Sequence, residues 1–87
     1  MHMSQWDKLL TRIIFLSKDI RFEELRKVLE HYGYTMHAPR GGSSHYTFRK
    51  PGKFPITIPK NEPIKRTYVE FVKEVVEREE KQDEDRG

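Results

Sequence analysis

The chain has 87 residues and no cysteine. This length is too short for two domains of about 100–200 residues each, and the lack of cysteine excludes disulfide scaffolds, Cys-ligated zinc sites and thiol nucleophiles. The longest apolar run, residues 13–16, is far shorter than the ~20 residues that cross a bilayer. We therefore expect no membrane span, no signal peptide and a reducing, cytoplasmic location.

Two amphipathic helices are predicted in the first third of the chain. Apolar residues at the spacing i, i+3, i+4, i+7 and i+8 predict a helix over residues 4–16 with Ser4 as its N-cap. They are Trp6, Leu9, Leu10, Ile13 and Ile14. The same period returns over residues 21–32, and Gly33 follows at the position where a helix end needs a left-handed residue.

After Gly33 the apolar period changes to two, which predicts strands over residues 34–38, 44–49 and 54–58. Turn-forming segments separate them, so we expect a three-stranded antiparallel meander. Prolines at the third strand place it at an edge, because proline donates no ladder hydrogen bond. The apolar face contains the even-numbered residues Tyr34, Met36, Ala38, Tyr46, Phe48, Phe54, Ile56 and Ile58.

A final helix is predicted over residues 64–80, where the helical period returns. Three helices can cover the apolar face of the sheet and leave the other face open to water. The expected fold class is α+β, in the order α-α-β-β-β-α, with the helices on one face of the sheet. Residues 1–80 form a single domain in this prediction, and the acidic tail over residues 81–87 is disordered.

Odd-numbered strand residues form the open face, and the turns decide which of them lie side by side. They are Thr35, His37, His45, Thr47, Arg49 and Thr57. A longer first loop pairs His37 with His45, and a shorter one pairs it with Thr47. The second turn is expected to pair His45 with Thr57. In each case His45 lies exposed on the central strand.

Positive charge is concentrated in residues 37–66, where seven basic residues face a single acid, a net charge of +6. The basic residues are Arg40, Arg49, Lys50, Lys53, Lys60, Lys65 and Arg66. A block of this kind indicates a phosphate-bearing partner. The alternative is a solvated surface with no ligand.

An exposed histidine on such a face is suited to general acid–base chemistry near neutral pH, and His45 is the candidate. The alternative is a surface histidine with no role, and this applies more strongly to His37, whose place depends on register. Gly41 and Gly42 lack the spacing of a nucleotide-binding loop. His37 and His45 have no third ligand nearby, so we expect no metal and no cofactor.

The segment from Gly41 to Pro51, Gly-Gly-Ser-Ser-His-Tyr-Thr-Phe-Arg-Lys-Pro, resembles the HicA family, the small toxins of HicA–HicB toxin–antitoxin modules. The order of elements is also similar, as is the strand Ile-Thr-Ile-Pro at residues 56–59, and the likeness covers about residues 21–76. It implies a double-stranded-RNA-binding-like fold, cleavage of mRNA, inhibition of translation and a HicB-like antitoxin partner. The family's catalytic histidine corresponds to His45.

The resemblance also places Gly42 and Ser44 in the RNA-binding loop, although the family's Gly-Ser-His motif puts glycine at position 43, where this chain has serine. Metal-free RNA cleavage needs one proton removed, another donated and a phosphate held. His45 serves one transfer, and only His37 is available for the other. The remaining alternatives are a non-catalytic RNA-binding module on the same fold and a protein-interaction adaptor.

Overall fold

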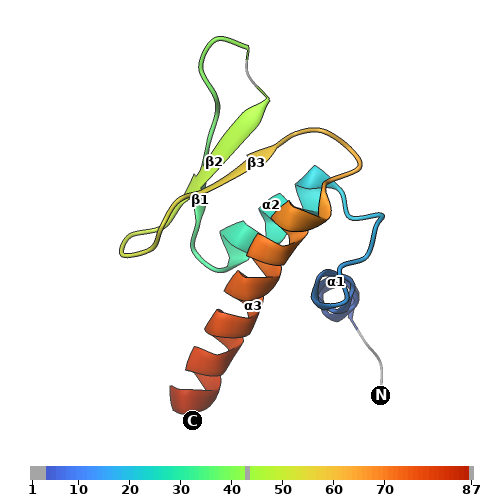
Figure 1. Ribbon diagram of the computed structural model, residues 1–87. Helices are drawn as coiled ribbons and strands as arrows, with labels where there is room; N and C mark the ends of the chain where they lie inside the picture. The colour runs from blue at the N-terminus through green and yellow to red at the C-terminus, as the bar shows by residue number, and fades with distance from the viewer. Residues whose placement is uncertain (1–3, 43, 87) are drawn as a thin grey trace.

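The computed structural model describes residues 4–42 and 44–86, with side chains as far as residue 81. Three helices and one antiparallel sheet follow each other along the chain (Figure 1). The elements are α1 (Gln5–Ile14), α2 (Phe22–His31), β1 (Thr35–His37), β2 (His45–Arg49), β3 (Ile56–Pro59) and α3 (Arg66–Arg86). The predicted α+β fold, with the order α-α-β-β-β-α, is confirmed.

Local sequence signals set the ends of the first two helices. The Asp7 N–H donates to the Ser4 hydroxyl at 3.1 Å, and the Ser4 N–H donates to the Asp7 carboxylate at 3.4 Å, which completes a capping box at α1. After α2, Gly33 has a φ of 94°. The N–H of Tyr34 then bonds to the carbonyl of Leu29 at 3.0 Å, as in a Schellman motif. The predicted caps are confirmed.

The sheet has the order β1-β2-β3, so β2 is central and β3 is an edge strand, as predicted. His37 pairs with Thr47, which matches the shorter of the two first loops. The predicted pairing of His45 with Thr57 is wrong, because His45 pairs with Pro59. The turn between β2 and β3 is longer than expected. The pairing of β3 with β2 is shifted by two residues from the predicted register, and a shift of two keeps every side chain on its predicted face.

The core lies between one face of the sheet and the helices α2 and α3 (Figure 1). Phe48 and Ile58 are fully buried, and the Phe22 ring centroid lies 6.1 Å from that of Phe48. Tyr46 and Ile56 are half-buried at the border of this core. No polar side chain is buried among the residues described. The predicted apolar face is therefore the packed one.

Three apolar residues predicted for the core or its face lie at the surface instead. Phe54 is 92% exposed because β3 begins at Ile56 and leaves Phe54 in the preceding turn. Ala38 is exposed just beyond the end of β1. Phe71 of α3 is 44% exposed, at the edge of the surface that faces the sheet.

Helix α3 is longer than predicted, since it continues from Arg66 to Arg86 rather than ending at residue 80. The backbone of the acidic tail is helical as far as Arg86, and residue 87 lies outside the part of the chain that is described. Within the described part, none of the helices has the length and apolar character needed to cross a membrane.

Arg12 links α1 to the start of α2. Its guanidinium lies 2.6 Å from the Glu24 carboxylate and 3.0 Å from that of Asp19. Burial acts to raise the pKa of Glu24, but hydrogen bonds from Arg12 and from the Arg21 N–H outweigh it and hold that pKa below its ordinary value. The ionised form of Glu24 therefore stabilises the contact between the two helices.

We expect Glu24→Gln to lower the free energy of unfolding by about 1 kcal/mol near neutral pH. A carboxyl group whose folded pKa is depressed stabilises the fold above its unfolded pKa, and this contribution disappears as the pH falls through the folded pKa. Thermal unfolding of both proteins from about pH 7 down to about pH 3 measures the effect. The difference should vanish in acid. Glu74→Gln is the control, because Glu74 forms no ion pair with the side chains that the structure describes. A difference independent of pH would contradict the assignment.

Candidate functional site

The open face of the sheet carries polar side chains in rows across the strands. His37, Thr47 and Thr57 form one row across all three strands, and the hydroxyl oxygens of the two threonines lie 3.3 Å apart. Thr35 pairs with Arg49 in the next row. The open face therefore combines hydroxyl, imidazole and guanidinium groups. All of these side chains belong to the odd-numbered positions that were predicted for this face.

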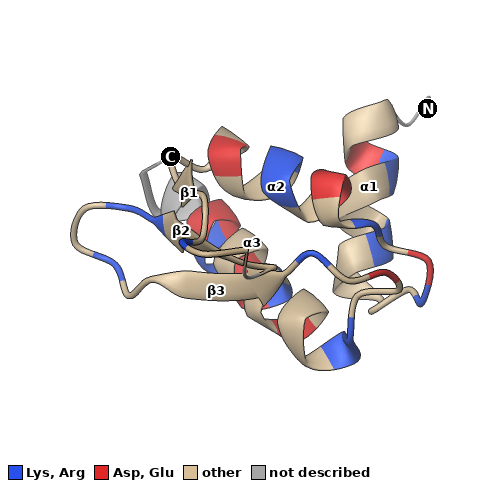
Figure 2. Ribbon diagram, turned by 90° about the horizontal axis from the view of Figure 1, so that it is seen from above, with Lys and Arg blue, Asp and Glu red and all other residues tan. Residues whose placement is uncertain are grey.

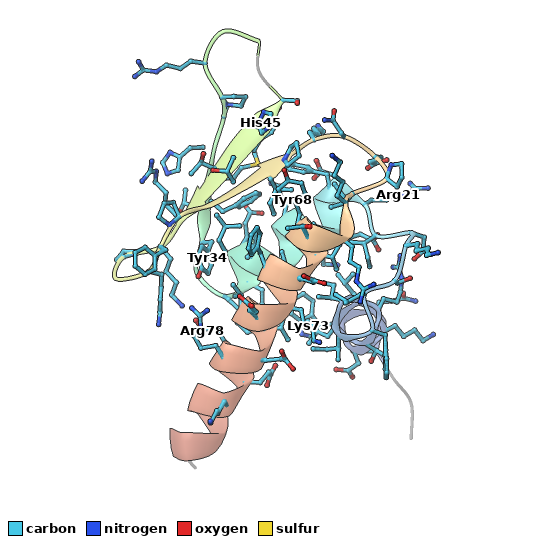
Figure 3. The ribbon with its side chains drawn as sticks, in the orientation of Figure 1. Arg21, Tyr34, His45, Tyr68, Lys73 and Arg78 are labelled. Carbon is cyan, nitrogen blue, oxygen red and sulfur yellow. The ribbon has the colours of Figure 1, made fainter. Side chains whose placement is uncertain are left out.

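His45 is the first residue of β2, and its side chain is exposed. Figure 3 shows it at the beginning of β2, well away from Arg78 of α3. The Lys60 N–H donates to the Ser44 carbonyl at 2.7 Å, so cross-strand bonding continues past His45. This bond and the central strand hold the backbone of His45 in place.

The loop before His45 depends on glycine. Gly41 and Gly42 have φ values of 65° and 79°, which side chains other than glycine rarely adopt. Ser44 is half-buried at the end of this loop, and Arg40 is exposed at its start. Gly42 and Ser44, the loop residues predicted to bind RNA, thus belong to the segment that leads into His45. Position 43, where the family's glycine is expected, lies outside the described residues.

A shallow hollow of about 390 Å³ lies on the open face between β1 and the turn that joins β2 to β3. Its walls are Thr35, His37, Arg49, Lys50, Pro51, Lys53 and Pro55. Arg49 and Lys53 form no ion pair with any side chain in the described part of the protein. Their charges are therefore available to an anion in the hollow.

Acidic residues are absent from this region of the sequence. From His31 to Asn61 the chain contains no Asp or Glu. Figure 2 shows Lys and Arg, and no Asp or Glu, on the turn between β2 and β3, whereas the helices and the loops that join them carry both signs of charge. The open face is thus positively charged and carries no carboxylate.

Three predicted phosphate-binding residues have carboxylate partners instead. The Lys50 ammonium lies 2.8 Å from Glu79 in a largely buried ion pair, where Lys50 is 24% and Glu79 14% exposed. Lys60 lies 3.8 Å from Glu23, and Arg66 lies 3.2 Å from Glu70 in the same helix. Their charges are partly neutralised.

The direction of these side chains follows from strand parity. Lys50 and Lys60 have even numbers, like the apolar residues that face the helices. The Lys50 ammonium accordingly lies 5.7 Å from the centre of the Tyr34 ring, and that of Lys60 lies 5.7 Å from the centre of the Phe22 ring. The sequence alone shows that Lys50 and Lys60 have even numbers and so predicts their direction. It does not predict their acidic partners, which lie in segments distant along the chain. Lys65 is exposed immediately before α3, outside the hollow.

Across residues 4–42 and 44–81, no three His, Asp or Glu side chains gather into a group that would hold a metal ion. On the open face the structure brings His37, Arg49 and Lys53 together at the hollow. His45 lies diagonally from His37 at the other end of β2, and Arg40 lies in the adjoining loop. They can transfer protons and bind an anion.

No family model matches this chain, and neither does any curated protein or any solved structure. The function is therefore argued from the residues and geometry of the open face.

Proposed function

We propose that this protein is a metal-independent endoribonuclease that cleaves mRNA in the cytoplasm, inhibits translation and acts as the toxin of a type II toxin–antitoxin system. The observation that carries the proposal is His45, an exposed histidine on the central strand of a cationic, acid-free face. The resemblance of residues 41–51 to the HicA family supports the same reaction. His45 acts as an acid or base in it.

The reaction uses the ribose 2′-hydroxyl as its nucleophile. The 2′-oxygen attacks the adjacent phosphorus, the bond to the 5′-oxygen breaks, and a 2′,3′-cyclic phosphate and a 5′-hydroxyl result. His45 carries out one of the two proton transfers. Arg49 and Lys53, whose charges have no partner among the described side chains, stabilise the additional negative charge on the phosphorane.

The proposed partner is a HicB-like antitoxin with an acidic surface. His45 is exposed, and Arg49 and Lys53 lie on the same side of the sheet. An acidic surface laid over this face would exclude RNA and neutralise the same cations. Binding of RNA and of the antitoxin are therefore mutually exclusive in this proposal.

The proposal is tested by incubating the purified protein with mRNA in the presence of EDTA and analysing the ends of the products. We expect cyclic phosphate and 5′-hydroxyl ends, and binding that weakens steeply with salt through release of counterions. Lys53→Glu should weaken binding and flatten the salt dependence by roughly 0.7 in the log–log slope for each phosphate of a single strand that the variant no longer neutralises. Lys27→Glu, on the opposite side at α2, is the control.

The alternatives give different results in the same experiment. Salt-dependent binding with no cleavage would favour a non-catalytic RNA-binding module on the same fold. Absence of RNA binding at low salt would reject both readings and favour an adaptor that docks an acidic protein.

A further inference from the structure

The register of the sheet brings the two histidines of the open face close together. His37 pairs directly with Thr47, and His45 precedes Thr47 by two positions on the same strand and the same face. The two histidines are therefore diagonal neighbours, with Cβ atoms roughly 7 Å apart. Imidazole rings at this spacing can both reach one phosphodiester group placed between them, since each hydrogen bond spans about 2.6–3.2 Å.

Among the described strand residues of the open face, no other side chain is an acid–base group of the kind that works near neutral pH. The paired strand residues with the parity of the open face are His37, His45, Thr35, Thr47, Arg49, Thr57 and Pro59, of which Pro59 is buried. No carboxylate lies among them. Imidazole is the side chain that both accepts and donates a proton near neutral pH. The second proton transfer of the proposed reaction therefore falls to His37 if a strand residue performs it.

The cationic hollow lies on the side of His37. His37, Arg49 and Lys53 are among its walls, while His45 is not. The charged groups that face His37 are Arg49 from β2 and Lys53 and Lys50 from the turn, and the ammonium of Lys50 is paired with Glu79. An RNA phosphate held by Arg49 and Lys53 would thus have His37 beside it, and His45 would lie two residue pairs beyond His37 along the sheet, in the next row of the same face.

We propose that His37 is a second catalytic residue and that it works with His45 as an acid–base pair across the scissile phosphate. This inference rests on the proposed function and adds to it the residue that completes the chemistry. One histidine accepts the proton of the 2′-hydroxyl as the bond between the 2′-oxygen and phosphorus forms. The other, protonated at the start, donates its proton to the 5′-oxygen as the bond from phosphorus to that oxygen breaks.

No net proton is taken up or released in this step. The products are the 2′,3′-cyclic phosphate and the 5′-hydroxyl, and each histidine finishes in the protonation state in which the other began. A single histidine would have to leave one of these transfers to water or to a group less suited to it near neutral pH. The proposed pair therefore predicts that both histidines are required for fast cleavage, so that loss of one alone slows the reaction.

The test compares His37→Ala and His45→Ala on two RNA oligonucleotides that contain a mapped cleavage site. One is natural, and the other carries a bridging sulfur in place of the 5′-oxygen at that site. Both variants should cleave the natural RNA at least about 100-fold more slowly than the wild type. The variant that lacks the general acid should recover on the sulfur substrate, because a thiolate leaves without protonation, and the other variant should not.

A control and the contrary outcomes separate this inference from the proposed function. His31→Gln replaces an exposed histidine of α2 and should cleave both substrates like the wild type. If His37→Ala cleaves natural RNA at the wild-type rate while His45→Ala does not, the pair is refuted and the proposed function stands. If both variants are slow and neither recovers on the sulfur substrate, His37 is not a proton-transfer residue. If the wild type cleaves no RNA, both proposals fail.

Binding gives a second measurement that does not depend on turnover. A 2′-deoxy oligonucleotide of the same sequence cannot be cleaved by attack of a 2′-hydroxyl. Its addition to the wild-type protein should shift the imidazole NMR signals of both His37 and His45 and leave that of His31 unchanged. A shift confined to His45 would overturn the pair.

Discussion

Replacement of His45 by alanine is expected to lower the rate of RNA cleavage by at least about 100-fold and to leave the fold unchanged. General acid–base catalysis by one side chain contributes about 10²–10⁴-fold. The side chain is exposed, and surface substitutions usually change stability by less than about 0.5 kcal/mol. The rate is measured on purified protein, with circular dichroism and thermal unfolding as the check on folding.

The same variant has a clear expectation in cells. Induced expression of the wild type should arrest growth and degrade mRNA, whereas His45→Ala should do neither at an equal protein level. His31→Gln, expressed in parallel, should behave like the wild type. Cleavage at the wild-type rate by a folded His45→Ala protein would remove His45 from the mechanism.

The second large effect concerns the core. Phe48→Ala is expected to cost roughly 3–5 kcal/mol, which is the range for truncating a buried aromatic side chain. Phe48 is fully buried on the central strand and packs against Phe22. Since the stability of a small domain is about 5–15 kcal/mol, this single change removes a large share of it. Urea unfolding measures the loss.

Phe54→Ala is the matched control for this prediction. Both residues are phenylalanines with even numbers close together in the chain, but Phe54 is 92% exposed. Its truncation should change stability by less than about 0.5 kcal/mol. Similar losses of stability for the two variants would contradict the register of β3, which leaves Phe54 outside the strand.

Together the two predictions separate chemistry from stability. His45 lies on the open face of β2, and Phe48 lies on the packed face of the same strand. The first variant should be folded and inactive. The second should lose activity only in proportion to the fraction of the protein that is unfolded.

Local patterns in the sequence determined the elements and their faces. The helical spacing of apolar residues, the Ser4 cap and the glycine at position 33 each act within a few residues, so the chain alone defines them. Alternation along β2 likewise separates His45 and Thr47 from Tyr46 and Phe48. This is why an error of two residues in the register did not move any strand side chain to the wrong face.

Element ends and turn lengths were less predictable. Nothing local distinguishes a turn that ends before Phe54 from one that continues to the start of β3 at Ile56. Helix α3 also continues beyond the last apolar residue of its stripe, because charged residues with good helix propensity can extend a helix that is already formed.

Only the tertiary structure decided which charges remain available on the open face and which histidines are neighbours. The pairing of Lys50 with Glu79 joins residues from a turn and a distant helix, and no local pattern specifies it. The diagonal placement of His37 and His45 depends on the length of the loop between β1 and β2, for which the sequence allowed two registers. Alternation assigns a residue to a face, whereas loop closure and packing select its neighbours on that face.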